Sequence, residues 1–152
     1  MDLITDRFTI GVFRDVPSAE AGIEALARHG FAASTLSVIA KATPEVEALV
    51  QRVFGVNPPA PIEVGNLGPA ILHGQLIGVL DTERRELSTR GLSGTARRAG
   101  FQAHDCVIFE RLVARGGVLV AISSEARSSD ALATLHAFGG GNAAIGAWTG
   151  RV

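Results

Sequence analysis

The same strand, helix, strand pattern occurs at both ends of the chain, and this repeat limits the fold more than any other feature. Residues 8–41 begin with the apolar run FTIGVF, continue as an amphipathic segment, and finish with the alternating run TLSVIA. Residues 117–148 repeat that order as GVLVAIS, SSDALATLHAFG and NAAIGAW. Short apolar runs rich in strand formers predict strands, and spacings of three and four predict helices. We therefore predict two βαβ-type halves.

The first half shows the pattern most clearly. Ile10 and Val12 fall on one face of the predicted strand, because alternate residues of a strand point the same way. Ser18 is predicted as the N-cap of the helix, and Gly30 as the left-handed residue that ends it. The second half has matching leucines and a glycine at residue 139.

Two such halves can pair in one antiparallel sheet with both helices on one face, which is the ferredoxin-like plan of an α+β fold. At 152 residues the chain has the length of one domain. We predict a single domain, residues 1–152, with a first half at 8–41, a helical and loop insertion at 42–116 and a second half at 117–148.

The insertion is predicted to be mainly helical. Thr43 is a cap, Pro44 suits the first helical position and Gly55 suits the helix end. The proline-rich stretch 56–70 predicts a loop. We predict helices over 71–91, where apolar residues keep helical spacing despite two glycines, and over 92–100 and 103–117.

Charge and composition exclude several classes of partner. Fourteen Lys and Arg residues balance fifteen Asp and Glu, so the net charge of -1 supplies no field for nucleic acid or an anionic membrane. Apolar runs are too short to span a bilayer, and the first residues lack a signal-peptide pattern. The single cysteine excludes an internal disulfide. We expect a soluble cytoplasmic protein without nucleic-acid or membrane partners.

Three stretches carry a resemblance to a known family. They are TIGVFRDVPSAEAGIEALARHGFAASTLSVIA at 9–40, GPAILHGQLIGVL at 68–80 and GFQAHDCVIFERLVARGGVLVAI at 100–122. Together they resemble the general stress protein domain of the YflT type, also described as heat-induced stress protein, and its uncharacterised bacterial relatives. Many relatives have a longer glycine-zipper segment than the one here. The resemblance implies a stress-linked bacterial protein with an α+β core, and it supplies no catalytic residues.

The glycine runs do not predict a phosphate site. Phosphate loops place glycine before a helix, where N–H groups converge. Here the runs ARGGVLVA at 114–121 and FGGGN at 138–142 follow helical segments, whose ends present carbonyl groups. We predict that these glycines turn the chain.

His104 and Cys106 are a candidate catalytic pair that the spacing argues against. Residues two positions apart on a helix point about 200° away from each other, so the side chains of His104 and Cys106 cannot serve one centre. We expect Cys106 to pack in the core with Phe109, Leu112 and Val113. The other histidines are isolated in sequence, and His29 and His136 suit helix C-termini, so we expect no metal and no cofactor.

A basic stretch supplies the candidate binding residues. Residues 83–98 contain five arginines and two glutamates. Such a stretch is either a solvated helix face or a site for an acidic protein partner or a small anionic ligand such as a nucleotide phosphate. The candidate ligand-binding residues are Arg84, Arg85, Arg97 and Arg98.

These observations lead to a first hypothesis and two alternatives. Apolar residues make up 47% of the chain and charged residues 19%, which indicates surface that a second copy covers. We expect a non-enzymatic stress-response or protein-interaction module that forms a homo-oligomer. The alternatives are a small-ligand-binding regulatory domain and a small enzyme that uses Cys106 or His104.

Overall fold

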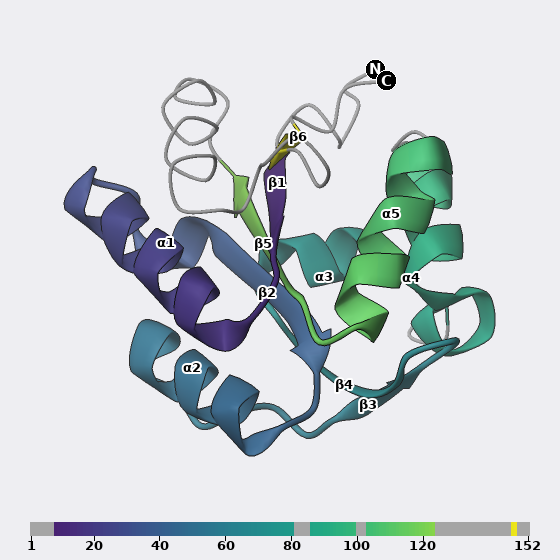
Figure 1. Cartoon of the computed structure of the whole chain (residues 1–152), viewed down its shortest axis with the longest axis horizontal. Coiled ribbons are helices and arrows are strands. Elements are labelled where there is room, and N and C mark those ends of the chain that lie inside the picture. The colour runs from purple at the N-terminus through teal and green to yellow at the C-terminus, as the bar shows by residue number, and fades with distance from the viewer. Residues whose placement is uncertain (1–7, 81–85, 100–102, 124–146, 149–152) are drawn as a thin grey trace.

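The computed structural model describes residues 8–80, 86–99, 103–123 and 147–148 (Figure 1). Along the chain the elements are β1 (Phe8–Phe13), α1 (Val16–Arg28), η2 (Ala33–Thr35), β2 (Leu36–Lys41), α2 (Pro44–Phe54), β3 (Ile62–Val64), β4 (Gly68–His73), α3 (Gln75–Leu80), α4 (Glu86–Ala99), α5 (Ala103–Ala114), β5 (Val118–Ser123) and β6 (Ala147–Trp148).

One sheet runs in the order β3-β4-β2-β5-β1-β6, and all neighbouring strands are antiparallel. Strands β2 and β5 pair at its centre, with Val38 opposite Val120 and Ile39 opposite Leu119. β1 and β2 are joined through α1 and lie on either side of β5. The predicted α+β class with an antiparallel sheet is therefore confirmed.

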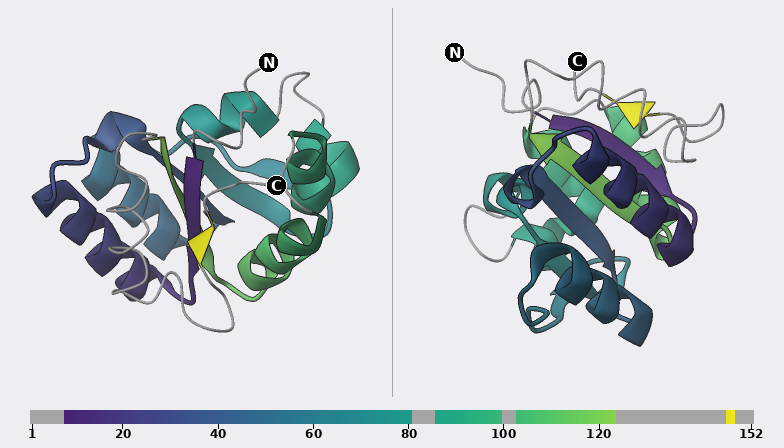
Figure 2. Two further views of the ribbon diagram at one scale, coloured as in Figure 1. Left: turned by 90° about the horizontal axis from the view of Figure 1, so that it is seen from above. Right: turned by 90° about the vertical axis from the view of Figure 1, so that its left-hand side faces the viewer.

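Helices cover both faces of this sheet (Figure 2). Alternate strand residues belong to two separate buried clusters, because successive side chains of a strand point to opposite faces. Val38 and Val120 pack with α1 and α2, whereas Ile39 and Leu119 pack with α4 and α5. The helices of the insertion therefore cover the face opposite α1. The second helix of the predicted repeat, 128–139, lies outside the described residues, so the ferredoxin-like plan is not confirmed.

Burial on two sides also explains the composition of the strands. In β5 the residues Val118 to Ile122 are all buried, since neither face of this central strand meets solvent. A strand in such a position is apolar along its whole length. The high apolar content of the chain therefore has a cause within the fold.

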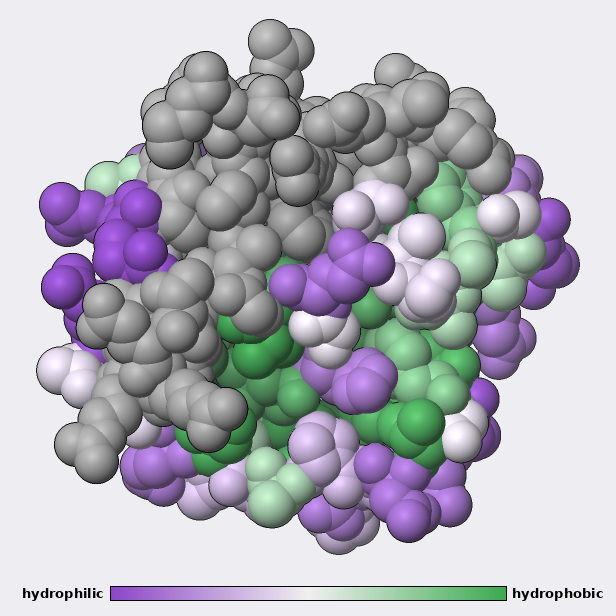
Figure 3. Space-filling model, turned by 180° about the vertical axis from the view of Figure 1, so that it is seen from behind, coloured by the Kyte–Doolittle hydropathy of each residue, from purple (hydrophilic) through white to green (hydrophobic). Residues whose placement is uncertain are grey.

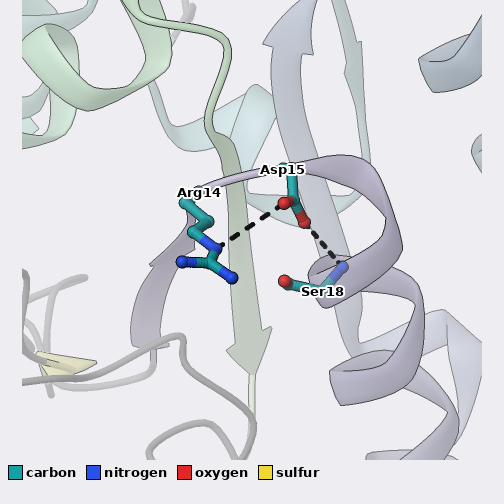
Figure 4. A network of polar contacts seen from close by, with 3 residues as sticks. All are labelled: Arg14, Asp15 and Ser18. Atoms are coloured by element: carbon teal, nitrogen blue, oxygen red, sulfur yellow. Dashed lines mark hydrogen bonds and ion pairs between the residues drawn. The ribbon is translucent and has the colours of Figure 1, made fainter.

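Helix α1 begins one turn earlier than the predicted cap suggests. Asp15 is the N-cap: its Oδ1 accepts a hydrogen bond from the backbone N–H of Ser18 at 2.9 Å, so Ser18 is the capped residue (Figure 4). The Arg14 side chain lies beside the same carboxylate, with Nε 3.6 Å from Oδ2. These contacts lower the pKa of Asp15, chiefly through its hydrogen bonds with Ser18. After the C-terminal end of α1, Gly30 has a φ of 89°, the left-handed conformation that was predicted for it.

Helix α2 follows the prediction closely. Thr43 Oγ1 accepts a hydrogen bond from the N–H of Val46 at 3.2 Å, and Pro44 occupies the first turn. Gly55 ends the helix in the left-handed conformation with φ 66.

The segment predicted as loop and then helix, 56–91, contains two strands. β3 and the start of β4 lie in the predicted loop, and Ile71 to His73 belong to β4 although a helix was predicted there. Ala70 and Leu72 face one cluster and Ile71 the other, which is strand alternation. Pairing of Leu72 with Ile39 extends the sheet beyond β2. The insertion 42–116 therefore supplies strands as well as helices.

The rest of the chain matches the prediction where it is described. α4 and α5 confirm the two later helices, and β5 confirms the strand that opens the second half. The predicted helix over 128–139 lies outside the described residues. Of the predicted strand over 142–148 only β6 is described, and it pairs with β1. In the described part of the chain, every helix is too short or too polar to cross a bilayer.

Gly22 allows α1 to approach the sheet, which gives a stability prediction. A Cβ at this position would lie 2.8 Å from Phe13 Cε1 and closer still to Cζ, and Phe13 is fully buried. Replacing glycine by alanine in a helix gains about 1 kcal/mol, and overpacking a core costs about 1–3 kcal/mol. We expect Gly22→Ala to lower the free energy of unfolding by about 1 kcal/mol in urea denaturation.

Two further variants separate the two effects. Ala21→Gly, at an exposed site of the same helix, reports the helix propensity alone. Phe13→Leu should reduce the cost of Gly22→Ala in a double-mutant cycle, because it removes the ring atoms that the new methyl group meets. Higher stability of Gly22→Ala in the wild-type background would contradict the described packing of Phe13.

Candidate functional site

Helix α4 separates an apolar side from a basic side. Leu87, Leu92 and Ala96 are buried against the sheet and α5. Arg90, Arg97 and Arg98 are exposed. Arg90 belongs to the part of α4 before Gly91, and Arg97 and Arg98 belong to the part after it, yet all three line one hollow.

The arginines surround a hollow of about 360 Å³ that we call the arginine hollow, lined by Arg90, Gly94, Arg97 and Arg98. Gly94 also lines it, and a larger residue there would collide with Arg90, since a Cβ at Gly94 would lie 2.8 Å from the Cβ of Arg90. Guanidinium groups stay charged at any physiological pH and offer several donors in a fixed plane. The lining is therefore a concave surface with three positive groups.

A kink within α4 sets the position of this face. Gly91 has φ 73 and ψ 177, a conformation that only glycine adopts readily, and it divides the helix into two segments. Glu110 on α5 caps the second segment: its Oε2 accepts from the N–H of Ser93 at 3.0 Å, and Oε1 accepts from Asn66 Nδ2 at 3.4 Å. A carboxylate is favoured there by the helix dipole.

The first segment of α4 is held against the edge of the sheet. The N–H of Gly65 donates to the carbonyl of Leu87 at 3.0 Å, and Ser88 Oγ donates to the carbonyl of Glu63 at 2.7 Å. In the second segment Thr95 Oγ1 donates to the carbonyl of Gly91 at 2.8 Å. Both halves of the helix that carries the arginines are thus fixed by hydrogen bonds.

The structure brings together part of the predicted set of binding residues. Arg97 and Arg98 both line the arginine hollow. Arg84 and Arg85 lie outside the described residues. Arg90 was missed as a binding residue, because the kink at Gly91 separates it from Arg97 and Arg98 and helical spacing does not apply across that kink.

His104 and Cys106 do not form a site. His104 is exposed, whereas Cys106 is fully buried near Phe109 and Val113. Burial, with a smaller contribution from the charge of Asp105, raises the pKa of the Cys106 thiol from 9.0 to about 12, and the charge of Arg97 opposes this shift. The thiol is protonated at neutral pH, which agrees with the predicted core position.

The remaining candidates have structural roles or lie outside the described residues. His29 is the C-cap of α1, as its position in the sequence suggested. The His73 ring packs against the Phe54 ring in a tilted arrangement, with centroids 4.2 Å apart. His136 and the glycines of 138–142 are not described.

Gly116 and Gly117 close α5 through hydrogen bonds to Val113 and Leu112, so the chain turns there as predicted. Across the described ranges, His, Cys, Asp and Glu side chains form no group of three that could hold a metal ion.

Comparison with known proteins finds no family model, no curated protein and no solved structure that matches the chain. The resemblance to the general stress protein domain stays a prediction.

The raised pKa of Cys106 gives a prediction for stability at high pH. Because the folded state holds the thiol proton more tightly, its contribution to stability is complete below pH 9.0 and is lost as the pH rises from 9.0 toward about 12. The chain has no Tyr and one Lys, Lys41, so few other side chains titrate in this range. We expect the free energy of unfolding to fall between pH 9 and 11.

Two measurements check the position of this thiol. Cys106→Ala should be less stable than the wild type at pH 8 but should lose less stability toward pH 11. Iodoacetamide should label the native protein at least about a hundredfold more slowly than the unfolded chain. Fast labelling of the native protein at neutral pH would show an accessible thiolate and contradict this account.

Proposed function

We propose that the protein is a small-ligand-binding module that holds an anionic group, such as a phosphate or carboxylate, in the arginine hollow. One observation carries the proposal: Arg90, Arg97 and Arg98 line one concavity together with Gly94, which has no side chain to fill it. The volume of about 360 Å³ falls within the range of small-molecule sites.

Charge complementarity supports this choice of ligand. The whole chain has a net charge of -1, yet the lining of the hollow has three arginines and no acid. Hydrogen bonds between guanidinium groups and oxyanions are stronger than neutral ones and are often bidentate. Arg90 and Arg98 also interact with other groups of the protein, so a bound anion shares these side chains.

The rigidity of α4 is the second argument. Glu110 and Thr95 fix the segment that bears Arg97 and Arg98, so the backbone of the site is ordered before a ligand arrives. Preorganisation of this kind lowers the entropic cost of binding.

Titration with inorganic pyrophosphate tests the proposal. Calorimetry should detect binding, and the melting temperature should rise because the ligand binds the native state only. A charge-assisted hydrogen bond contributes about 1.5–3 kcal/mol, so Arg97→Ala or Arg98→Ala should weaken binding about tenfold or more. Added salt should weaken it as well.

Arg28→Ala is the matched control, since Arg28 is an exposed arginine at the end of a different helix. It should bind pyrophosphate like the wild type. The same affinity for all three variants would show nonspecific attraction, and no detectable binding by the wild type would reject the site.

A second candidate is the self-associating interaction module expected from the composition. Seen from behind, the molecule shows apolar side chains that reach the surface between charged ones (Figure 3). Ile62 in the edge strand β3 and Val107 on α5 are exposed large apolar side chains. Two-sided burial of the sheet already accounts for much of the apolar content, so we place ligand binding first. A role in the stress response and a cytoplasmic location remain part of this second proposal.

Sedimentation equilibrium tests the second candidate. A homo-oligomer should give a mass that is a multiple of 15.8 kDa and that falls on dilution. A mass of one chain at high protein concentration would exclude self-association as the function.

A further inference from the structure

A second pocket lies in the opposite helical layer from the arginine hollow. It occupies about 280 Å³ between α1, α2 and the start of β2, and we call it the α1–α2 pocket. Its apolar lining includes Ile23, Phe31, Leu36 and Val53.

The inner wall of the α1–α2 pocket is apolar and ordered. Ile23 and Phe31 are each 4% exposed and Leu36 is 2% exposed, so these side chains belong to the core and also face the pocket. Ala27 and Ala33 are exposed and too small to close the opening. At roughly 30 Å³ per molecule the space equals about nine waters, which suits a ligand below drug size.

The charged residues at the α1–α2 pocket differ in kind from those of the arginine hollow. Arg52 Nε donates to Glu20 Oε2 at 2.6 Å, and this ion pair joins α2 to α1. Glu24 lies one turn further along α1, lines the same pocket, and makes no ion pair with a described residue. The charge of Arg52 is thus balanced by Glu20, whereas the Glu24 carboxylate has no ion-pair partner among the described residues.

Another hollow adjoins the α1–α2 pocket. It has a volume of about 560 Å³ and shares Ala33 and Leu36 with the α1–α2 pocket, so the two lie side by side. Its lining includes Phe54 and His73, whose rings are in contact and tilted by 51° relative to each other. An apolar chain that outgrows the α1–α2 pocket can extend over Leu36 toward these rings.

We infer that the α1–α2 pocket binds a small amphipathic cation, an amine with a short alkyl or aryl tail. The tail lies against Ile23, Phe31 and Leu36, and the ammonium group lies beside the Glu24 carboxylate. This site shares no residue with the arginine hollow. It stands or falls independently of the proposed function.

A series of ligands with one tail and different head groups tests the inference. Hexylamine, hexanol and hexanoate are titrated separately, with amide chemical shifts of the wild-type protein as the readout. We expect hexylamine to shift the amides of Ile23, Ala27 and Leu36 and to bind at least about tenfold more tightly than hexanoate. Octylamine should bind more tightly than hexylamine, because it buries more apolar surface.

Two substitutions locate the tail and the head group. Ala27→Leu fills the opening with a residue that helices accept, and it should abolish hexylamine binding. Ala21→Leu, at an exposed position of the same helix away from the pocket, is its control and should bind normally. Glu24→Gln should weaken hexylamine about threefold to tenfold and leave hexanol unchanged, whereas Glu45→Gln on α2 should change neither.

Several outcomes would overturn the inference. Hexanoate binding as tightly as hexylamine would mean that Arg52, and not Glu24, selects the head group. Hexylamine binding by Ala27→Leu would place the amine elsewhere. If none of the three ligands shifts an amide signal, the site is rejected. If Ala27→Leu alone changes the oligomeric mass, the pocket is a contact with a second copy of the chain and the inference is rejected as well.

Discussion

The sheet buries both of its faces, and the rest of the structure depends on this. β2 and β5 pair at the centre, and each successive residue along them enters the opposite core, as Val38 and Ile39 do. Such strands have no polar face on which a binding site can be built. The arginine hollow and the α1–α2 pocket accordingly lie in the two helical layers, one on each side of the sheet.

The sequence predicts well those features that depend on near neighbours. Thr43 and Gly55 mark the ends of α2 because capping involves residues only three or four positions apart. The core position of Cys106 follows from helical spacing alone. At the start of α1 the same logic identified the right turn but the wrong residue, since both Asp15 and Ser18 are good caps.

Features that depend on distant partners were not predicted. Ile71 and Leu72 fit helical spacing as well as strand alternation, and pairing with β2, some thirty residues away, decides in favour of β4. Which sheet face each helix covers depends on the packing of the whole chain, so no short sequence pattern indicates it. The α1–α2 pocket likewise combines Glu24, Leu36 and Arg52, whose proximity requires the folded chain. The arginine hollow was predicted in part, because Arg97 and Arg98 are neighbours in the basic stretch, whereas Arg90 joins them only across the kink at Gly91.

The hydrogen bonds between α4 and β3 affect how this sheet meets other proteins. A strand at a sheet edge exposes unpaired N–H and C=O groups that invite a strand from another molecule. Here β3 is a strand of three residues, and Ser88 already occupies the carbonyl of Glu63 while the neighbouring N–H of Gly65 bonds to Leu87. A foreign strand must displace α4 before it can join this edge. Association that extends the sheet into fibrils or into a swapped dimer is therefore blocked on the β3 side, and partners there meet side chains instead of backbone.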